Sequence, residues 1–256
     1  MNDRTLDVQN LAVDFRQDGE ITHAVRGVSF HVDKGETVAL VGESGSGKSV
    51  SALSTVQLLG DSATVGGSIT YNGTQMVGAS EKDLQRVRGN DISFIFQEPM
   101  TSLSPLHTIG DQVTEALKLH KSVSQEEANA EAIKMFERVG FPNPERALET
   151  YPFELSGGLR QRAMIAMALI CRPALLIADE PTTALDVTIQ AQITELVANL
   201  QEQLGMAIIW ITHDLGVVAG LVEKVAVMYA GHIIEMAPVR DLYVNTSHPY
   251  TLGLLE

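Results

Sequence analysis

The sequence is short of cysteine, of long apolar runs and of basic residues, and each shortage narrows the possible functions. Its one cysteine, Cys171, excludes an intrachain disulfide and a zinc site or cluster built from cysteines of this chain, and it favours a reducing compartment. No apolar run approaches the roughly 18 residues that a membrane-spanning helix needs. Residues 1–4 include an acid and precede no apolar core, so they do not resemble a signal peptide.

Basic residues are scarce as well, because 18 Lys and Arg stand against 32 Asp and Glu, for a formal charge of −14. This balance argues against a broad nucleic-acid face, which needs clustered basic side chains. It also argues against direct adhesion to an anionic leaflet. With 256 residues, 45% of them apolar, the chain is nevertheless long enough to bury a substantial core. If it works at a membrane, we expect a protein partner to hold it there.

What the sequence does have is a glycine-rich loop between a strand and a helix. Residues 37–41 are β-branched or aliphatic and predict a buried strand. The spacing that follows is G-x-x-x-x-G-K-S, filled by Gly42, Gly47, Lys48 and Ser49. Such a loop turns backbone N–H groups towards a phosphate, while its lysine meets the outer phosphates and its serine reaches a magnesium ion. The predicted nucleotide-phosphate loop comprises Gly42, Glu43, Ser44, Gly45, Ser46, Gly47, Lys48, Ser49 and Val50.

Two other predicted strand ends carry side chains that suit phosphate chemistry. An apolar strand at 174–178 ends in Asp179 and Glu180, whose side chains point to opposite sides, so one can serve magnesium while the other faces a water. A solvated turn is the alternative for two acids in this position. A second buried strand, at 207–211, leads to His213 at the same predicted edge of the sheet.

A second anion site is predicted at the start of another helix. Residues 159–170 are strong helix formers, so Ser156, Gly157 and Gly158 stand at a helix N-terminus with bare N–H groups. A plain serine cap with a flexible lead-in is the alternative.

The rest of the chain predicts an α/β core with an inserted helical block. Residues 5–32 alternate in polarity and predict two strands joined by a turn. Residues 98–160 look helical, and within them Ser124 and Glu127 form a capping box. Further elements are expected at 50–59 (helix), 92–96 (strand), 189–204 (helix ended by Gly205) and 225–235 (hairpin).

Taken together, these motifs resemble the ATPase subunits of ABC transporters, and the general pattern covers nearly the whole chain. The resemblance implies the following assignments: Walker A loop, 42–49; Q-loop, Gln97; signature, Ser156, Gly157, Gly158 and Gln161; Walker B, Asp179 and Glu180; D-loop, Asp186; switch histidine, His213; adenine-stacking aromatic, Phe15. The signature reads L-S-G-G-L rather than L-S-G-G-Q, and Gln161 belongs to a similar L-R-Q-R variant. Phe15 could instead be a core residue of its strand, and His23 is an alternative stacking residue.

The fold that this resemblance implies is an α/β P-loop NTPase core of the ABC ATPase type, with an antiparallel β subdomain and an inserted helical subdomain. We expect a single domain over 1–256, in which the core comprises 1–97 and 161–235, the helical subdomain about 98–160, and a tail, apparently truncated, 236–256.

More narrowly, the chain resembles the peptide and nickel importer branch, the dipeptide or oligopeptide permease ATPases. The stretches that carry this likeness are 97–105, 151–158, 178–186 and 248–251. Members of that branch often continue with a cysteine-containing tail, which the sequence does not include.

The resemblance implies an ATPase that uses ATP and Mg²⁺ and couples hydrolysis to solute transport. Lys48 and the loop amides would hold the β- and γ-phosphates, Glu180 would act as general base on the attacking water, and His213 would contact the γ-phosphate. Ser49 and Gln97 would ligate magnesium directly, and Asp179 would hold it through water. The signature would cap ATP on a second subunit in a head-to-tail dimer.

The implied location is the cytoplasmic face of the cell membrane, as a peripheral protein. The implied partners are a second ABC ATPase subunit (a homologue, or another copy), two transmembrane permease subunits on which 97–111 would press, and, indirectly, an extracytoplasmic solute-binding protein. No nucleic-acid partner is expected. The alternatives are a DNA-repair or chromosome ATPase with the same motifs, and a non-catalytic nucleotide-binding regulator, which the presence of Glu180 and His213 disfavours.

Overall fold

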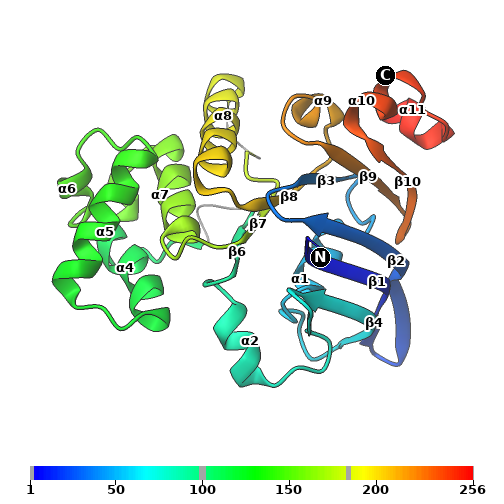
Figure 1. Cartoon of the computed structure of the whole chain (residues 1–256), viewed down its shortest axis with the longest axis horizontal. Coiled ribbons are helices and arrows are strands. Elements are labelled where there is room, and N and C mark those ends of the chain that lie inside the picture. The colour runs from blue at the N-terminus through cyan, green and yellow to red at the C-terminus, as the bar shows by residue number, and fades with distance from the viewer. Residues whose placement is uncertain (1–2, 98–101, 183–185, 256) are drawn as a thin grey trace. The chain divides into compact units, whose positions relative to one another are not determined.

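The computed structural model describes residues 3–97, 102–182 and 186–255 of an α/β protein (Figure 1). Two compact units are evident: unit 1 comprises residues 1–87 and 207–256, and unit 2 comprises residues 88–206. The predicted helical subdomain, 98–160, falls within unit 2, which also holds residues that we assigned to the core. The limits of the helical subdomain, about 98–160, remain a prediction.

Unit 1 contains two groups of strands and five short helices among its described residues. Its elements are β1 (Arg4–Gln17), β2 (Glu20–Asp33), β3 (Thr37–Val41), α1 (Lys48–Ser54), β4 (Ala63–Tyr71), β5 (Thr74–Gln75), α2 (Glu81–Val87), β8 (Ala207–Thr212), α9 (Leu215–Val218), β9 (Lys224–Tyr229), β10 (His232–Pro238), α10 (Val239–Val244) and α11 (Pro249–Leu255).

The first group is the antiparallel sheet β2-β1-β4-β5, which confirms the predicted antiparallel part of the fold. Asp18 and Gly19 both adopt positive φ in the β1–β2 turn, as a tight hairpin with a right-handed twist requires. Leu6, Val8, Leu11 and Val13 of β1 are fully buried, and a register shift between Val8 and Leu11 interrupts the alternation.

The second group places β3 parallel to both β8 and β9, with β10 antiparallel to β9. All residues of β3 and β8 are buried, because a parallel strand in the middle of a sheet is covered on both faces. This explains why 38–41 and 207–211 are uninterrupted apolar stretches, and the predicted strands at 37–41 and 207–211 are both confirmed.

The helix after the glycine-rich loop is shorter than expected, since α1 ends at Ser54 and not at Leu59. Three side chains bond back to the last turn: Ser54 Oγ donates to the Val50 carbonyl, Thr55 Oγ1 to the Ala52 carbonyl and Gln57 Nε2 to the Ser54 carbonyl. Such bonds compete with the main-chain ladder, and Gln57 then turns the chain with φ 53°.

Unit 2 combines two parallel strands with a group of helices. Its elements are β6 (Ile92–Ile95), α4 (Ile109–His120), α5 (Gln125–Arg138), α6 (Pro144–Ala147), the 3₁₀ helix η1 (Pro152–Glu154), α7 (Gly157–Leu169), β7 (Leu175–Asp179) and α8 (Val187–Leu204). β6 and β7 pair in parallel, from Ile92 with Leu175 to Ile95 with Ala178. Figure 1 shows α4, α5, α6 and α7 packed together as one helical group.

The predicted capping box at the start of α5 is confirmed. Ser124 Oγ accepts from the Glu127 N–H at 3.2 Å, and Glu127 Oε2 accepts from the Ser124 N–H at 2.7 Å. These hydrogen bonds hold the pKa of Glu127 below its usual range. At the other end, Gly140 adopts φ 77° just beyond the helix, as glycines that follow a helix C-terminus commonly do.

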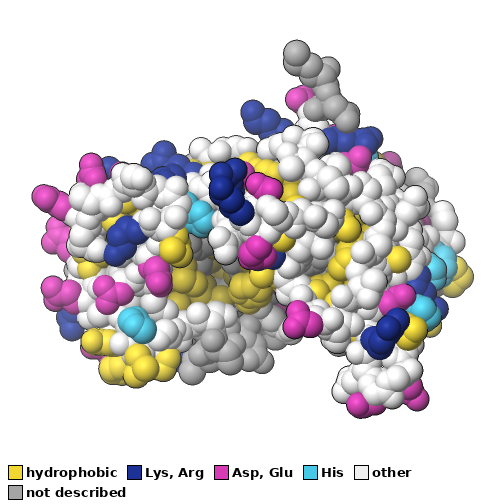
Figure 2. Space-filling model, turned by 90° about the horizontal axis from the view of Figure 1, so that it is seen from below, with side chains coloured by type: hydrophobic (Ala, Val, Ile, Leu, Met, Phe, Trp, Pro, Cys, Tyr) yellow, Lys and Arg dark blue, Asp and Glu magenta, His cyan; other side chains and the backbone are white. Residues whose placement is uncertain are grey.

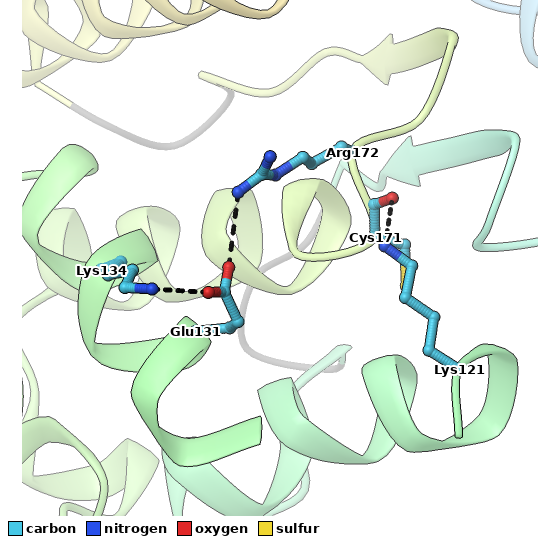
Figure 3. Close-up of polar contacts among 5 residues, drawn as sticks. All are labelled: Lys121, Glu131, Lys134, Cys171 and Arg172. Atoms are coloured by element: carbon cyan, nitrogen blue, oxygen red, sulfur yellow. Dashed lines mark hydrogen bonds and ion pairs between the residues drawn. The ribbon is translucent and has the colours of Figure 1, made fainter. Parts of the chain in front are cut away.

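Polar contacts tie α5 and the end of α4 to the turn after α7 (Figure 3). Glu131 lies between Lys134 at 2.7 Å and Arg172 at 3.4 Å, while Lys121 Nζ donates to the Cys171 carbonyl at 3.3 Å. Cys171 itself is buried, and this burial raises the pKa of its thiol. The thiol is therefore a packing group rather than a reactive one.

Within the described residues, no helix has both the length and the apolar character to span a bilayer. On the face drawn in Figure 2, Lys and Arg side chains are scattered among Asp and Glu side chains.

Candidate nucleotide site

The loop between β3 and α1 is shaped by glycines that cannot carry a side chain. A Cβ on Gly42 would lie 2.2 Å from the Met228 carbonyl oxygen, and one on Gly47 would lie 2.8 Å from the Ala24 carbonyl oxygen. Gly47 also caps α1 in the left-handed region, at φ 100°. The loop therefore packs against β9 and β2 so closely that only glycine fits at these two positions.

Lys48, at the start of α1, folds back over the loop. It is 5% exposed, and its Nζ donates to the carbonyls of Gly42 at 2.7 Å and Glu43 at 2.9 Å. The buried ammonium of Lys48 therefore lies beside the backbone of the loop. A bound phosphate needs this combination of a positive charge and backbone N–H groups. Ser49 and Val50 follow in the first turn of the helix, both half-buried, while Ser44 and Gly45 are exposed at the tip of the loop.

A hairpin turn from far along the chain supports this loop. Ala230 and Gly231 join β9 to β10 with positive φ, and the Gly231 N–H donates to the Ser46 carbonyl at 3.1 Å. The sequence predicts the hairpin but not this contact, because a turn sequence does not show which segment the turn will pack against.

Unit 2 brings together three of the predicted site residues. Asp179 ends β7 and Glu180 follows it, both half-buried. Gln97 Nε2 donates to Glu180 Oε2 at 2.9 Å. Glu180 adopts φ 43°, a left-handed conformation that is uncommon outside glycine. Residues 98–101 of the predicted Q-loop segment lie outside the described part of the chain.

The predicted signature stands at the start of α7. Ser156 caps the helix, with its side chain accepting from the Leu159 N–H at 3.4 Å, and Ser156 and Gly157 are exposed. A Cβ on Gly158 would lie 3.3 Å from Ile189 Cγ2 of α8. Gln161 differs from the other three, because it is 1% exposed and its Nε2 donates to the Pro181 carbonyl. Its side chain therefore links α7 to the turn after β7 rather than lying at the open helix start.

The remaining predicted residues occupy strand or helix ends. Asp186 caps α8, with Oδ1 accepting from the Ile189 N–H at 2.9 Å, while residues 183–185 before it lie outside the described part. His213 is exposed just after β8. Phe15 is half-buried on β1. His23 Nδ1 lies 2.7 Å from Asp14 Oδ1, so its ring already has an acidic neighbour.

ATP and Mg²⁺ fit the residues present. The glycine cradle and the buried ammonium of Lys48 suit a triphosphate. Ser49 of unit 1 offers a hydroxyl oxygen, and Gln97 and Asp179 of unit 2 each offer an amide or carboxylate oxygen. Oxygens of these kinds are the hard ligands that magnesium prefers. An α/β fold with this loop, this helix start and these strand-end acids defines a P-loop nucleotide-binding protein.

Comparison with known proteins identifies the family. The family model described as "ABC transporter" matches residues 25–183. A probable peptide ABC transporter ATP-binding protein, y4tR of Sinorhizobium fredii, is 53% identical over 99% of this chain and 76% of the relative. The oligopeptide transport ATP-binding protein OppD of Bacillus subtilis is 52% identical over 98% of this chain and 71% of the relative.

A solved structure agrees with these sequence matches. The ATP-binding cassette MJ0796, described as a dimeric post-hydrolysis state bound to ADP and Pi, has a TM-score of 0.80 at 28% identity and covers 92% of this chain and 99% of its own. The chain therefore belongs to the ABC transporter family, as an ATP-binding ATPase subunit. The relatives are transport proteins by name, so the alternative of a DNA-repair or chromosome ATPase is not supported.

Proposed function

We propose that this chain is the ATP-hydrolysing subunit of a membrane importer for peptides or related small solutes. The observation that carries the proposal is the loop from Gly42 to Ser49, in which two sterically required glycines surround the buried ammonium of Lys48. The peptide cargo is supported by the relatives from Sinorhizobium fredii and Bacillus subtilis, whose names specify peptide and oligopeptide transport.

Binding begins with an exchange of hydrogen bonds at Lys48. In the structure its ammonium is satisfied by the neutral carbonyls of Gly42 and Glu43. Phosphate oxygens are charged acceptors and form stronger hydrogen bonds, so the ammonium would turn to the outer phosphates while the loop amides hold the inner ones. Phe15 is proposed to stack on the adenine base.

Hydrolysis depends on the strand-end acids. Glu180 is the proposed general base, which takes a proton from the attacking water. Gln97 fixes one of the Glu180 oxygens in the structure, and we infer that it shares its amide between this carboxylate and the magnesium ligand set. Ser49 and Gln97 would ligate magnesium and Asp179 would hold it through water, and the ion would neutralise part of the phosphate charge. His213 is proposed to contact the γ-phosphate.

The site is completed by a second subunit in this proposal. Ser156, Gly157 and Gly158 would present the start of α7 to ATP held by the partner, and Asp186 would lie in the D-loop. The dimeric description of the MJ0796 structures supports such pairing. Two permease subunits would provide the membrane path and hold this chain peripherally at the cytoplasmic face, and an extracytoplasmic binding protein would deliver the solute.

The test is ATP binding and turnover by the purified chain and by Lys48→Ala. We expect the variant to bind MgATP at least roughly tenfold more weakly, since it loses a charge-assisted hydrogen bond to phosphate. Equilibrium titration with ATP measures the affinity, and thermal unfolding without nucleotide checks that the variant folds. Equal affinities for the two proteins would remove the phosphate-loop assignment and the proposal with it.

A further inference from the structure

We propose that Tyr250, near the C-terminal end of the described chain, is a positioning residue for the phosphate loop. Its hydroxyl accepts a hydrogen bond from the backbone N–H of Glu43 at 3.0 Å, across 207 positions in sequence. The proposal rests on the assignment of residues 42–49 as the phosphate loop, and it adds a contact that the proposed function does not require.

The contact acts on one peptide unit of the loop. The Glu43 N–H and the Gly42 carbonyl belong to the same planar peptide group. The N–H is held by Tyr250, while the carbonyl accepts from Lys48 Nζ at 2.7 Å. Hydrogen bonds at the two ends of a peptide polarise and orient it together. Tyr250 therefore fixes the orientation of the first peptide of the phosphate loop, a contact that remains when the ammonium turns to the phosphates.

The segment that carries Tyr250 is itself anchored. Glu235 of β10 accepts from the Ser247 N–H at 2.9 Å and from the His248 N–H at 3.3 Å. The Tyr250 N–H then donates to His248 Nδ1 at 3.1 Å. Although burial opposes its ionisation, the hydrogen bonds from the Ser247 and His248 N–H groups help to lower the pKa of Glu235. The carboxylate is thus ionised at neutral pH, which is the form that accepts these bonds.

An aromatic contact joins this anchor to the turn that supports the loop. The ring of Tyr250 packs against Tyr229 with centroids 4.6 Å apart and planes 50° apart. Tyr229 is the last residue of β9, directly before the turn whose Gly231 donates to the Ser46 carbonyl. The loop is therefore held at Glu43 by a side chain of α11 and at Ser46 by the turn between β9 and β10. These elements lie beside one another in unit 1 (Figure 1).

Burial raises the pKa of Tyr250 above the ordinary value of a tyrosine, so the hydroxyl stays protonated and neutral at physiological pH. It can then accept from Glu43 without placing a negative charge beside the phosphates. The contact orders the loop equally in the ground state and in the transition state. Its loss therefore weakens the binding of both states by the same amount. It should raise KM and the dissociation constant for MgATP while kcat stays the same.

The experiment uses the whole chain and three variants. Tyr250→Phe deletes only the hydroxyl; Leu252→Ala removes an exposed side chain from the same helix as a control; Lys48→Ala serves as the reference for the phosphate loop. We expect Tyr250→Phe to raise the dissociation constant and KM for MgATP roughly 3- to 10-fold, with kcat within twofold and an unchanged Tm. Leu252→Ala should match the parent.

Amide hydrogen exchange provides a readout that needs no nucleotide. The Glu43 amide should exchange faster in Tyr250→Phe and at the parental rate in Leu252→Ala. Parental exchange at Glu43, or parental MgATP affinity in Tyr250→Phe while Lys48→Ala weakens binding, would overturn the inference alone. Failure of the proposed function would give a different result, because Lys48→Ala would then leave the affinity of the chain for ATP unchanged.

Discussion

At the scale of single residues, Glu180 has the most unusual backbone of the predicted catalytic groups. Its φ of 43° costs on the order of 1 to 3 kcal/mol for a residue that is not glycine. Its side chain is also held, through the hydrogen bond from Gln97. A strained conformation persists only where its surroundings fix it, and such positions cluster at functional sites. Both observations support the proposed role of Glu180.

The residue-scale prediction concerns Glu180→Gln. The amide keeps the volume of the carboxylate and can still bond to Gln97, but it cannot accept a proton from water. We expect MgATP affinity within about twofold of the parent and turnover reduced by at least roughly 100-fold, the usual contribution of a general base. Parental turnover in a steady-state phosphate-release assay would show that another group takes the proton.

At the scale of elements, the start of α8 carries a residue, Asp186, that has both a structural role and a proposed functional role. Asp186 caps the helix through the Ile189 N–H, and Gly205 ends it with φ 64°. The capping alone explains an aspartate in this position. The D-loop assignment therefore needs a test that keeps the cap and changes the charge.

Asp186→Asn and Asp186→Ala form that pair. Asparagine is as good a cap as aspartate, whereas alanine should cost about 1 kcal/mol in the free energy of unfolding. Urea denaturation measures this difference, and ATP turnover by each folded variant measures function. If both variants lose turnover equally while only Asp186→Ala loses stability, the carboxylate has a role beyond the cap. Turnover that follows stability would reduce Asp186 to a capping residue.

At the scale of the whole molecule, the proposal predicts that ATP holds subunits together. Glu180→Gln with saturating MgATP should form a dimer, because each triphosphate is then capped by the signature of the other subunit and is not hydrolysed. Sedimentation velocity measures the state. Adding Gly158→Asp to this variant should return the monomer, since a negative charge at the start of α7 repels the partner's phosphates. A nucleotide-bound monomer of Glu180→Gln would contradict pairing between copies and leave a homologous subunit as the partner.

Several elements and the glycine-rich loop can be predicted from the sequence alone. The buried strands at 37–41 and 207–211, the capping box of Ser124 and Glu127 and the glycine-rich loop all follow from local propensity and short-range spacing, which a single sequence contains. The three-dimensional structure was needed to show that α1 ends at Ser54, that the Gln161 side chain bonds to the Pro181 carbonyl, and that the Tyr250 hydroxyl accepts from the Glu43 amide. Each of these features depends on the direction of a side chain or on a contact between distant segments. Neither leaves a repeating pattern in the sequence from which it could be predicted.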